Sequence, residues 1–149
     1  GGKKGWVRRE LVREIRKWNE SGEEETRKNL VADALSYLGA SYRWGGKTPQ
    51  GIDCSAMVFM AYMLAGVLIY RDSPMNERYP VKAIPKERLG MGDIIYWKGH
   101  VAIYLGDGKY VHSTGAQDRY RCLVNDLYPG SKSAIGGPAS SIIGYGSIF

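Results

Sequence analysis

Three side chains in this sequence have the chemistry of a thiol-dependent acyl-transfer site. The chain holds two cysteines and two histidines, and Cys54 is predicted in the first turn of an apolar helix. The free N–H groups and the dipole at a helix start favour the thiolate, which is the nucleophilic form of cysteine. The neighbouring Asp53 opposes this because its charge disfavours a second anion, so we expect a paired imidazolium to offset it.

The two histidines supply the other parts of such a site. His100 begins one predicted strand and His112 lies on the next, so both belong to one hairpin. A cysteine nucleophile needs a base, and the base needs a partner that orients it. The pattern therefore predicts Cys54 as the nucleophile, with the histidines as base and orienting group.

Other interpretations stay open from the pattern alone. Cys54 could be an inert buried cysteine, which is a common fate of that residue, and the histidines could be incidental strand residues. A zinc site formed by Cys54, His100 and His112 lacks an obvious fourth ligand. Cys122 is near no other candidate and is expected to be an ordinary packed thiol.

An apolar helix and a set of strands must position these side chains. Asp53 occupies an N-cap position, and residues 54–65 are apolar nearly all round, which predicts a helix that is buried on most sides and ends at Gly66. The hydrophobic period then changes to two, which predicts strands over 93–97, 101–105, 110–114 and 142–148. Because helices precede strands, the fold class is α+β with an antiparallel sheet.

Two earlier helices are predicted before the nucleophile helix. The first is amphipathic, with apolar residues at helical spacing between basic ones: Val7, Leu11, Ile15 and Trp18. Ser21 followed by Glu24 is typical of a capping box for the second, which is expected to stop at Gly39. The core face of that second helix is expected to be Leu30, Val31, Ala34, Leu35 and Leu38. Loops are expected over 39–52 and 128–140.

The hairpin that carries the histidines must place both rings on one face of the sheet. A two-residue Asp107-Gly108 turn, the default for such a sequence, would set His112 opposite Ile103 and separate the rings. We therefore predict a three-residue loop over 106–108. His100 is then diagonal to His112, roughly 7–8 Å away at the backbone. The predicted pairs are Leu105 with Lys109 and Ala102 with His112.

Composition and charge exclude several classes of protein. Hydrophobic residues are 44% and charged residues 24% of the 149, which is typical of a folded globular domain. Two cysteines exclude a disulfide scaffold and a four-cysteine zinc site, and no apolar run reaches the roughly 18 residues of a membrane span. The net charge of +6 suits an anionic polymer, but no zinc-finger spacing or RNP-like motif indicates a nucleic-acid partner.

The segments around the candidate residues resemble the NlpC/P60 family of cell-wall cysteine peptidases. Its nucleophile segment is similar to Tyr42-Arg43-Trp44-Gly45-Gly46 and Gly51-Ile52-Asp53-Cys54-Ser55, and its histidine segment to residues 89–94, 99–106 and 110–112. The likeness covers about residues 28–148. Departures are Ala56 and Ala102, where glycine is common, and Met91, where proline is common; we expect them to be tolerated.

This resemblance implies a papain-like fold with the nucleophile helix packed on an antiparallel sheet. It implies hydrolysis of peptidoglycan stem peptides, typically between D-γ-glutamate and a diamino acid, with no metal or other cofactor. Cys54 matches the nucleophile, His100 the base and His112 the polar residue that orients the base. Tyr42 matches a tyrosine that lines the site.

A narrower likeness points to the subgroup that trims stem fragments with a free N-terminal L-alanine. Asp72 matches the residue that pairs with the alanine amine, and Ser73 and Ser55 match residues that help to hold the substrate. Asp53 is also assigned to substrate binding. The subgroup carries an upstream SH3-like domain, whose final strand residues 4–7 resemble. We therefore expect a linker or helix over 1–27 and the catalytic domain over 28–149.

The expected partners are peptidoglycan stem peptides or released muropeptide fragments. The protein is expected to be secreted or associated with the cell wall, with a cytoplasmic wall-recycling enzyme as the alternative. Two other functions compete with the peptidase: a related Cys–His amidase or acyltransferase, and a non-catalytic wall-binding module. Loss of the nucleophile or the base would favour the binding module, and both residues are present.

Overall fold

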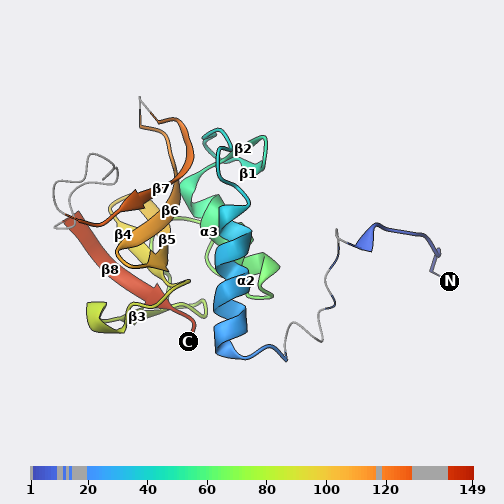
Figure 1. Ribbon diagram of the computed structural model, residues 1–149, viewed down its shortest axis with the longest axis horizontal. Helices are drawn as coiled ribbons and strands as arrows, with labels where there is room; N and C mark the ends of the chain where they lie inside the picture. Colours follow the sequence, from blue (N-terminus) through green and yellow to red (C-terminus); the bar gives the residue numbers. More distant parts are fainter. Residues whose placement is uncertain (1, 10–11, 13, 15–19, 117–118, 129–140) are drawn as a thin grey trace.

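The computed structural model describes residues 2–9, 12, 14, 20–116, 119–128 and 141–149. Within these residues the helices are α2 (Glu23–Leu35), α3 (Cys54–Leu64) and a short 3-10 helix, η2 (Lys86–Arg88). The strands are β1 (Lys47–Thr48), β2 (Gly51–Ile52), β3 (Lys82–Ile84), β4 (Ile94–Trp97), β5 (His100–Gly106), β6 (Lys109–Thr114), β7 (Arg121–Asp126) and β8 (Ile142–Ser147). Figure 1 shows both α-helices on one side of the main sheet, which is the α+β arrangement that the sequence predicts.

The main sheet is antiparallel throughout. Its strand order is β3-β8-β4-β5-β6-β7, while β1 and β2 form a separate two-stranded sheet just before α3. Helix α3 packs on β5 and β6, and α2 packs on α3. The predicted strands are confirmed as β4, β5, β6 and β8. The hydrophobic pattern did not indicate β3 and β7, and the loop expected over 39–52 contains the short strands β1 and β2.

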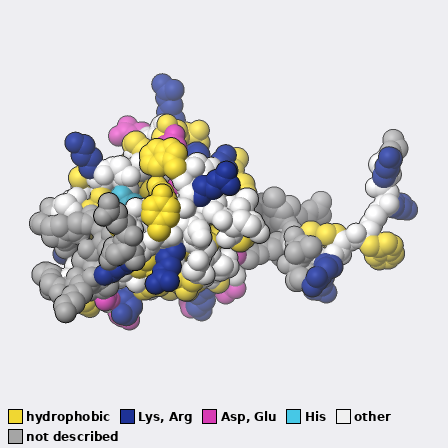
Figure 2. Space-filling model, turned by 90° about the horizontal axis from the view of Figure 1, so that it is seen from above, with side chains coloured by type: hydrophobic (Ala, Val, Ile, Leu, Met, Phe, Trp, Pro, Cys, Tyr) yellow, Lys and Arg dark blue, Asp and Glu magenta, His cyan; other side chains and the backbone are white. Residues whose placement is uncertain are grey.

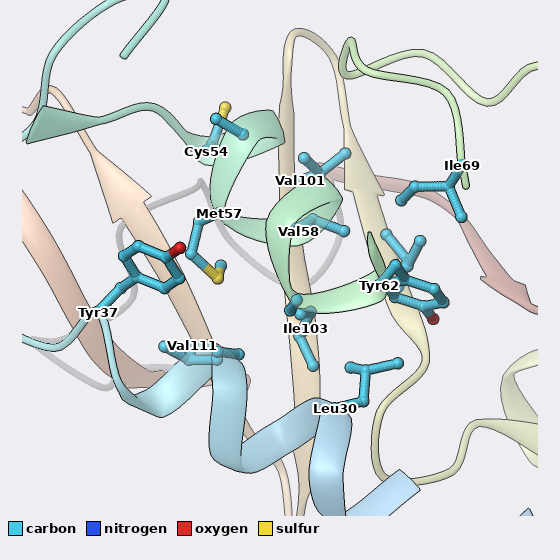
Figure 3. Close-up of a cluster of buried hydrophobic side chains, with 14 of the residues drawn as sticks. Leu30, Tyr37, Cys54, Met57, Val58, Tyr62, Ile69, Val101, Ile103 and Val111 are labelled. Atoms are coloured by element: carbon cyan, nitrogen blue, oxygen red, sulfur yellow. The ribbon is translucent and has the colours of Figure 1, made fainter. Parts of the chain in front are cut away.

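The main core lies between the two helices and one face of the sheet. Figure 3 shows Leu30 of α2, Met57 and Tyr62 of α3, Ile103 of β5 and Val111 of β6 meeting there, and all five are fully buried. Full burial stabilises a leucine, isoleucine, valine or methionine side chain by about 1.5–3 kcal/mol relative to exposure. A smaller cluster consists of Ile95, Trp97, Ala102 and Tyr110. The core therefore fixes α3 directly over the strands that carry the histidines.

The start of α3 matches the prediction closely. Asp53 is the N-cap, and its Oδ1 accepts the N–H of Ala56 at 2.7 Å. This bond satisfies one of the N–H groups that a helix start leaves without an intrahelical partner. The helix ends at Leu64, and Gly66 follows with φ +78°, a conformation that favours glycine.

Helix α2 begins and ends differently from the prediction. The expected capping box is wrong, because the N-cap is Gly22 and no side chain caps the helix. Glu24 instead pairs with Lys28 one turn later, at 2.6 Å. The helix stops at Leu35, so Leu38 leaves the core face and is 48% exposed.

Parts of two predictions lie outside the described residues. They are Leu11, Ile15 and Trp18 of the expected amphipathic helix, and residues 129–140 of the expected loop. The described Val7 is exposed. Within the described part of the chain, no helix combines the length and the apolar character needed to cross a membrane.

The register of the histidine hairpin follows the prediction. Ile103 pairs with Val111, and the same register sets Ala102 opposite His112. Residues 100 and 112 therefore lie on the same face of the sheet, as their proposed partnership requires.

The turn of this hairpin is nevertheless different from the prediction. Gly106 pairs with Lys109, so the loop is the two-residue Asp107-Gly108, and the expected pairing of Leu105 with Lys109 is wrong. Asp107 has φ 49° and the glycine after it φ 71°, as in hairpin turns with two left-handed residues. The register shifts between Tyr104 and Gly106, so Leu105 is the additional residue and forms a bulge. This bulge gives the rest of the hairpin the register that sets both histidines on one face.

Candidate active site

Cys54 is the first residue of α3 and lies at the edge of the main core. Figure 3 shows its sulfur pointing away from the other labelled side chains, and the residue is 7% exposed. Burial raises the pKa of its thiol; the N–H of Val101 opposes this shift, and the charge of Asp53 adds to it. The neutral thiol is therefore the resting form, rather than the thiolate expected from the helix start alone.

The two histidines meet across β5 and β6. Nε2 of His100 lies 2.6 Å from Nδ1 of His112, and the rings meet edge to face with centroids 4.9 Å apart. Burial lowers the pKa of His100 to about 4. Burial, with the charges of His100 and Arg119, lowers the pKa of His112 to about 3. Both rings are therefore neutral at neutral pH, and one of the two facing nitrogens donates the proton that the other accepts.

The chain on both sides of His100 borders Cys54. Gly99 lines the same cavity as Cys54, and the N–H of Val101 forms a hydrogen bond that stabilises the Cys54 thiolate. Gly99 also has φ +73° in the tight connection from β4 to β5, where a residue with a side chain is strained. The start of β5 thus lies against the start of α3 at Gly99 and at Val101, and His100 stands between these two residues in the sequence.

Asn125 extends the histidine pair and was missed by the sequence interpretation. Its Nδ2 lies 2.9 Å from Nε2 of His112, and the residue is 1% exposed. It lies diagonal to His112, because Leu123 is directly opposite that histidine in the β6–β7 pair. A polar residue at a buried strand position weakens the alternation that identifies strands, so β7 was not predicted.

A charged network connects the start of α3 to the chain that follows the helix. Arg71 Nη2 donates to Asp53 Oδ2 at 3.0 Å, and Arg71 Nη1 donates to Ser55 Oγ at 2.7 Å. The N–H of Gly45 donates to the same Asp53 oxygen at 2.8 Å. Burial would raise the pKa of Asp53, but the hydrogen bonds from Arg71, Ala56 and Gly45 outweigh it and lower that pKa. Arg71 is thus a second residue missed as a site member, although it stands beside Asp72 in the sequence.

One cavity of about 240 Å³ brings together all the predicted site residues except the two histidines. It is lined by Tyr42, Asp53, Cys54, Ser55, Asp72 and Ser73, with Trp44, Gly45, Arg71 and Gly99. Asp72 is exposed and Ser73 half-buried at its edge. Both Asp53 oxygens already accept hydrogen bonds within the chain, so in this structure Asp53 shapes the cavity.

Tyr42 reaches the cavity from the loop before β1. Its ring packs edge-on against Tyr120 with centroids 5.2 Å apart. Burial raises the pKa of the Tyr42 hydroxyl, and the nearby Cys54 and Asp53 raise it further. The hydroxyl is therefore protonated at neutral pH and is able to donate a hydrogen bond.

The histidine pair reaches the protein surface only in part. His112 is fully buried, whereas His100 is partly exposed. Figure 2 shows a face on which a histidine side chain comes to the surface beside hydrophobic and uncharged groups.

Cavity size alone does not identify this site. A larger cavity of about 550 Å³ borders the smaller hydrophobic cluster and contains no predicted site residue; it is lined by Lys86, Leu89, Tyr104, Asp107, Gly108, Leu127, Tyr128, Ile142 and Tyr145. The zinc alternative has no geometric support either, because no three His, Cys, Asp or Glu side chains in the described ranges are arranged to hold a metal ion.

Comparison with known proteins identifies the fold. A family model described as "NlpC/P60 family" matches residues 39–130. A solved NlpC/P60 family protein from Bacillus cereus has a TM-score of 0.67 to this chain at 31% identity, covering 80% of this chain and 39% of that one. The predicted papain-like α+β fold is thereby confirmed.

Two curated relatives extend the match beyond the family model. The chain is 42% identical over 128 residues to "Dipeptidyl-peptidase 6" of Lysinibacillus sphaericus, which is 85% of this chain and 46% of that protein. It is 35% identical over 124 residues to "Gamma-D-glutamyl-L-lysine dipeptidyl-peptidase" of Bacillus cereus, which is 78% of this chain and 37% of that protein. The chain thus spans less than half the length of both relatives.

Proposed function

Because the chain belongs to the NlpC/P60 family, we propose that it is a cysteine endopeptidase acting on peptidoglycan stem peptides. It hydrolyses the bond between D-γ-glutamate and the following diamino acid through a thioacyl-enzyme. The observation that carries this proposal is the contact between the start of α3, where Cys54 lies, and the start of β5, from which His100 reaches His112.

Acylation begins from the neutral pair. The Cys54 sulfur attacks the γ-carbonyl carbon of glutamate while its proton moves to Nδ1 of His100, since Nε2 of that ring faces His112. The carbonyl electron pair moves onto oxygen and forms a tetrahedral intermediate. When this intermediate collapses, the C–N bond breaks, His100 returns the proton to the departing amine, and a thioester remains on Cys54.

Two groups at the cavity are suited to stabilise the negative oxygen of the intermediate. The backbone N–H of Cys54 lies at the start of α3, where N–H groups have no intrahelical partner. The protonated Tyr42 hydroxyl lines the same cavity and is the second, weaker donor. Deacylation repeats the cycle with water: His100 takes a proton from water, hydroxide attacks the thioester, and the thiolate leaves and regains its proton.

The cavity edge supports a substrate with a free N-terminal amine. Asp72 is exposed beside Ser73 and Ser55 and is suited to pair with the ammonium group of L-alanine. Arg71 holds the Ser55 hydroxyl and Asp53, so it fixes the wall of this subsite. The names of the two relatives, which describe dipeptidyl-peptidases, agree with cleavage two residues from a free amine.

We further propose that the catalytic domain begins with α2, at Glu23 rather than at the predicted residue 28, because α2 packs on α3 and Arg27 pairs with the buried Asp93. The residues before it then link this domain to an upstream SH3-like domain. The relatives' greater length is compatible with such an arrangement. We assign the protein to the cell wall or the exterior of the cell, with wall recycling in the cytoplasm as the alternative. The net charge of +6 favours an acidic peptide substrate.

Mass spectrometry of digests of defined stem peptides tests the proposed reaction. The substrates are L-Ala-γ-D-Glu-L-Lys-D-Ala and its meso-diaminopimelate counterpart, each with a free and an N-acetylated amine. We expect release of the dipeptide L-Ala-D-Glu, fastest from the free-amine substrates. Cleavage at another bond, or product formation only with an acceptor other than water, contradicts the proposal and favours the amidase or acyltransferase alternative.

A further inference from the structure

Asn125 lies at the buried end of the histidine pair. Its side chain is 1% exposed and approaches Nε2 of His112 at 2.9 Å, while Nδ1 of His112 faces Nε2 of His100 at 2.6 Å. Three side chains from β5, β6 and β7 thus form one continuous chain of contacts. The free end of this chain is Nδ1 of His100.

The direction of this hydrogen-bond chain determines whether His100 is able to act as a base. His112 is neutral, so it carries one ring proton, and its two nitrogens take opposite roles. If Asn125 donates to His112, the His112 proton lies on Nδ1, and the His100 proton is then forced onto Nδ1 as well. That nitrogen is consequently unable to accept the thiol proton.

The opposite direction leaves His100 ready to react. If Asn125 accepts from His112 Nε2–H, then Nδ1 of His112 accepts from His100 Nε2–H, and Nδ1 of His100 keeps a free lone pair. This state requires the carboxamide oxygen of Asn125, rather than its nitrogen, beside His112. The oxygen and nitrogen of a carboxamide have nearly the same size, so a 180° turn fits the same space.

The structure shows the carboxamide in the orientation that leaves its oxygen idle. Oδ1 of Asn125 is buried and has no hydrogen-bond partner within the described part of the chain, whereas the nitrogen faces His112. The hydroxyl of Tyr110, which pairs with Asn125 in the sheet, also hydrogen-bonds this side chain. A turned carboxamide places its oxygen where it accepts from both His112 and the Tyr110 hydroxyl.

We propose that Asn125 is a positioning residue whose carboxamide oxygen accepts the Nε2–H of His112 in the working enzyme and thereby holds both histidines in the Nε2–H tautomer. The inference rests on the proposed function for its consequence in catalysis. The tautomers of the two histidine rings are properties of the free protein, so this part of the proposal is testable without a substrate.

Nitrogen-15 NMR of the histidine rings tests the tautomers directly. The chain holds two histidines, so a protein labelled at histidine gives two ring systems, and long-range proton–nitrogen correlations distinguish the two tautomers of each. In the full, reduced wild-type chain at pH 7 we expect both rings protonated at Nε2 with Nδ1 bare. Protonation of both rings at Nδ1 overturns the proposal, and this result stands whether or not stem peptides are hydrolysed.

Replacement of Asn125 supplies the kinetic test. In Asn125→Leu, which keeps the volume but removes the hydrogen bond, we expect each ring to become a mixture of tautomers and kcat to fall roughly 10- to 100-fold with KM nearly unchanged. The matched control is Ser147→Ala, which removes another buried side-chain hydrogen bond, to Asp93 at 2.6 Å, and should leave kcat and both tautomers unchanged. Unaltered tautomers and kcat in a folded Asn125→Leu protein contradict the proposal.

Discussion

Two networks meet at the start of α3, and they differ in charge and exposure. One joins Arg71, Asp53 and Ser55 through a salt bridge and charge-assisted hydrogen bonds. The other joins His100, His112 and Asn125 through neutral rings and a carboxamide. The Arg71 side chain is 23% exposed, whereas His112 and Asn125 are 0% and 1% exposed.

This difference in charge and exposure suits the two networks to different functions. Charges are stable at the cavity edge because water and opposite charges compensate their desolvation, and there Arg71, Asp53 and Ser55 line the cavity. Deeper in the protein, burial keeps both histidines neutral. The state of this network is therefore set by which ring nitrogen holds each proton and not by a net charge. We therefore propose that the charged network serves substrate binding and that the neutral network serves proton transfer.

The largest effect is expected at Cys54, which stands between Asp53 and Ser55 of the charged network at the start of α3. Cys54→Ala should abolish turnover while the protein stays folded, because a small residue at a helix start is compatible with the helix. Cys122→Ala is the matched control, since Cys122 is also buried but lies on β7, and it should keep most of the activity. Rates are measured on the free-amine stem peptide, with circular dichroism to check folding. Wild-type turnover by Cys54→Ala would end the cysteine-peptidase interpretation.

The second prediction concerns the neutral network and pH. The folded-state pKa values of His100 and His112 are about 4 and about 3, below the ordinary 6.5 of the unfolded chain. The unfolded state therefore binds more protons below pH 6.5, and stability is lost as pH falls from there toward 4. From pH 7 to pH 5 we expect a loss of about 2 kcal/mol for each histidine.

Urea unfolding at the two pH values measures this loss. The double variant His100→Gln/His112→Gln should lose the part of the pH dependence that comes from these rings. Equal pH slopes in the variant and in the wild type mean that the two rings have the same pKa values in the folded protein as in the unfolded chain, and the contrast between the networks then disappears.

The third prediction addresses the charged network. Arg71→Ala leaves the buried Asp53 carboxylate without its cation, so the free energy of unfolding should fall by about 2 kcal/mol, and the wall of the cavity should loosen. Lys109→Ala is the control, because it breaks an exposed pair with Asp126 and should cost less than about 1 kcal/mol. Equal losses in the two variants, measured by urea unfolding, would show that the Arg71 network has no special structural role.

The most selective effect, confined to one of two substrates, is expected at Asp72. A charge-assisted hydrogen bond to the substrate amine contributes about 1.5–3 kcal/mol, which corresponds to roughly 10- to 150-fold in kcat/KM. Asp72→Ala should lose this factor on the free-amine stem peptide and keep its rate on the N-acetylated one. Equal losses on the two substrates indicate a structural role for Asp72 and remove the support for the narrower subgroup.

The sequence predicts the parts of the site that follow from local pattern or from chemical necessity. Asp53 and the apolar run after it are sufficient to place Cys54 at a helix start. The shared face of His100 and His112 followed from the requirement that a base and its partner meet. The turn that achieves this was not predictable, because the additional residue lies in a bulge at Leu105 instead of in the loop.

Long-range partners are the part that the sequence leaves open. Asn125 lies on β7, where a polar residue at a buried position interrupts the hydrophobic alternation that identifies strands. Arg71 contacts Asp53 across 18 residues of chain. The ionisation of Cys54 and His100 was also predicted wrongly. A thiolate paired with an imidazolium was expected, but burial raises the pKa of the Cys54 thiol and lowers the pKa of His100 to about 4. In each case the decisive factor is a tertiary contact or tertiary burial, which no local pattern contains.

The most direct test of the central claim is the mass of the enzyme trapped during turnover. L-Ala-γ-D-Glu p-nitroanilide has a good leaving group, so acylation is fast and the thioacyl-enzyme accumulates before an acid quench. The account predicts that wild-type protein gains the mass of the L-Ala-γ-D-Glu acyl group on the peptide containing Cys54, with a matching burst of nitroaniline. Steady turnover with no adduct on Cys54, or an adduct on Cys122, would contradict it.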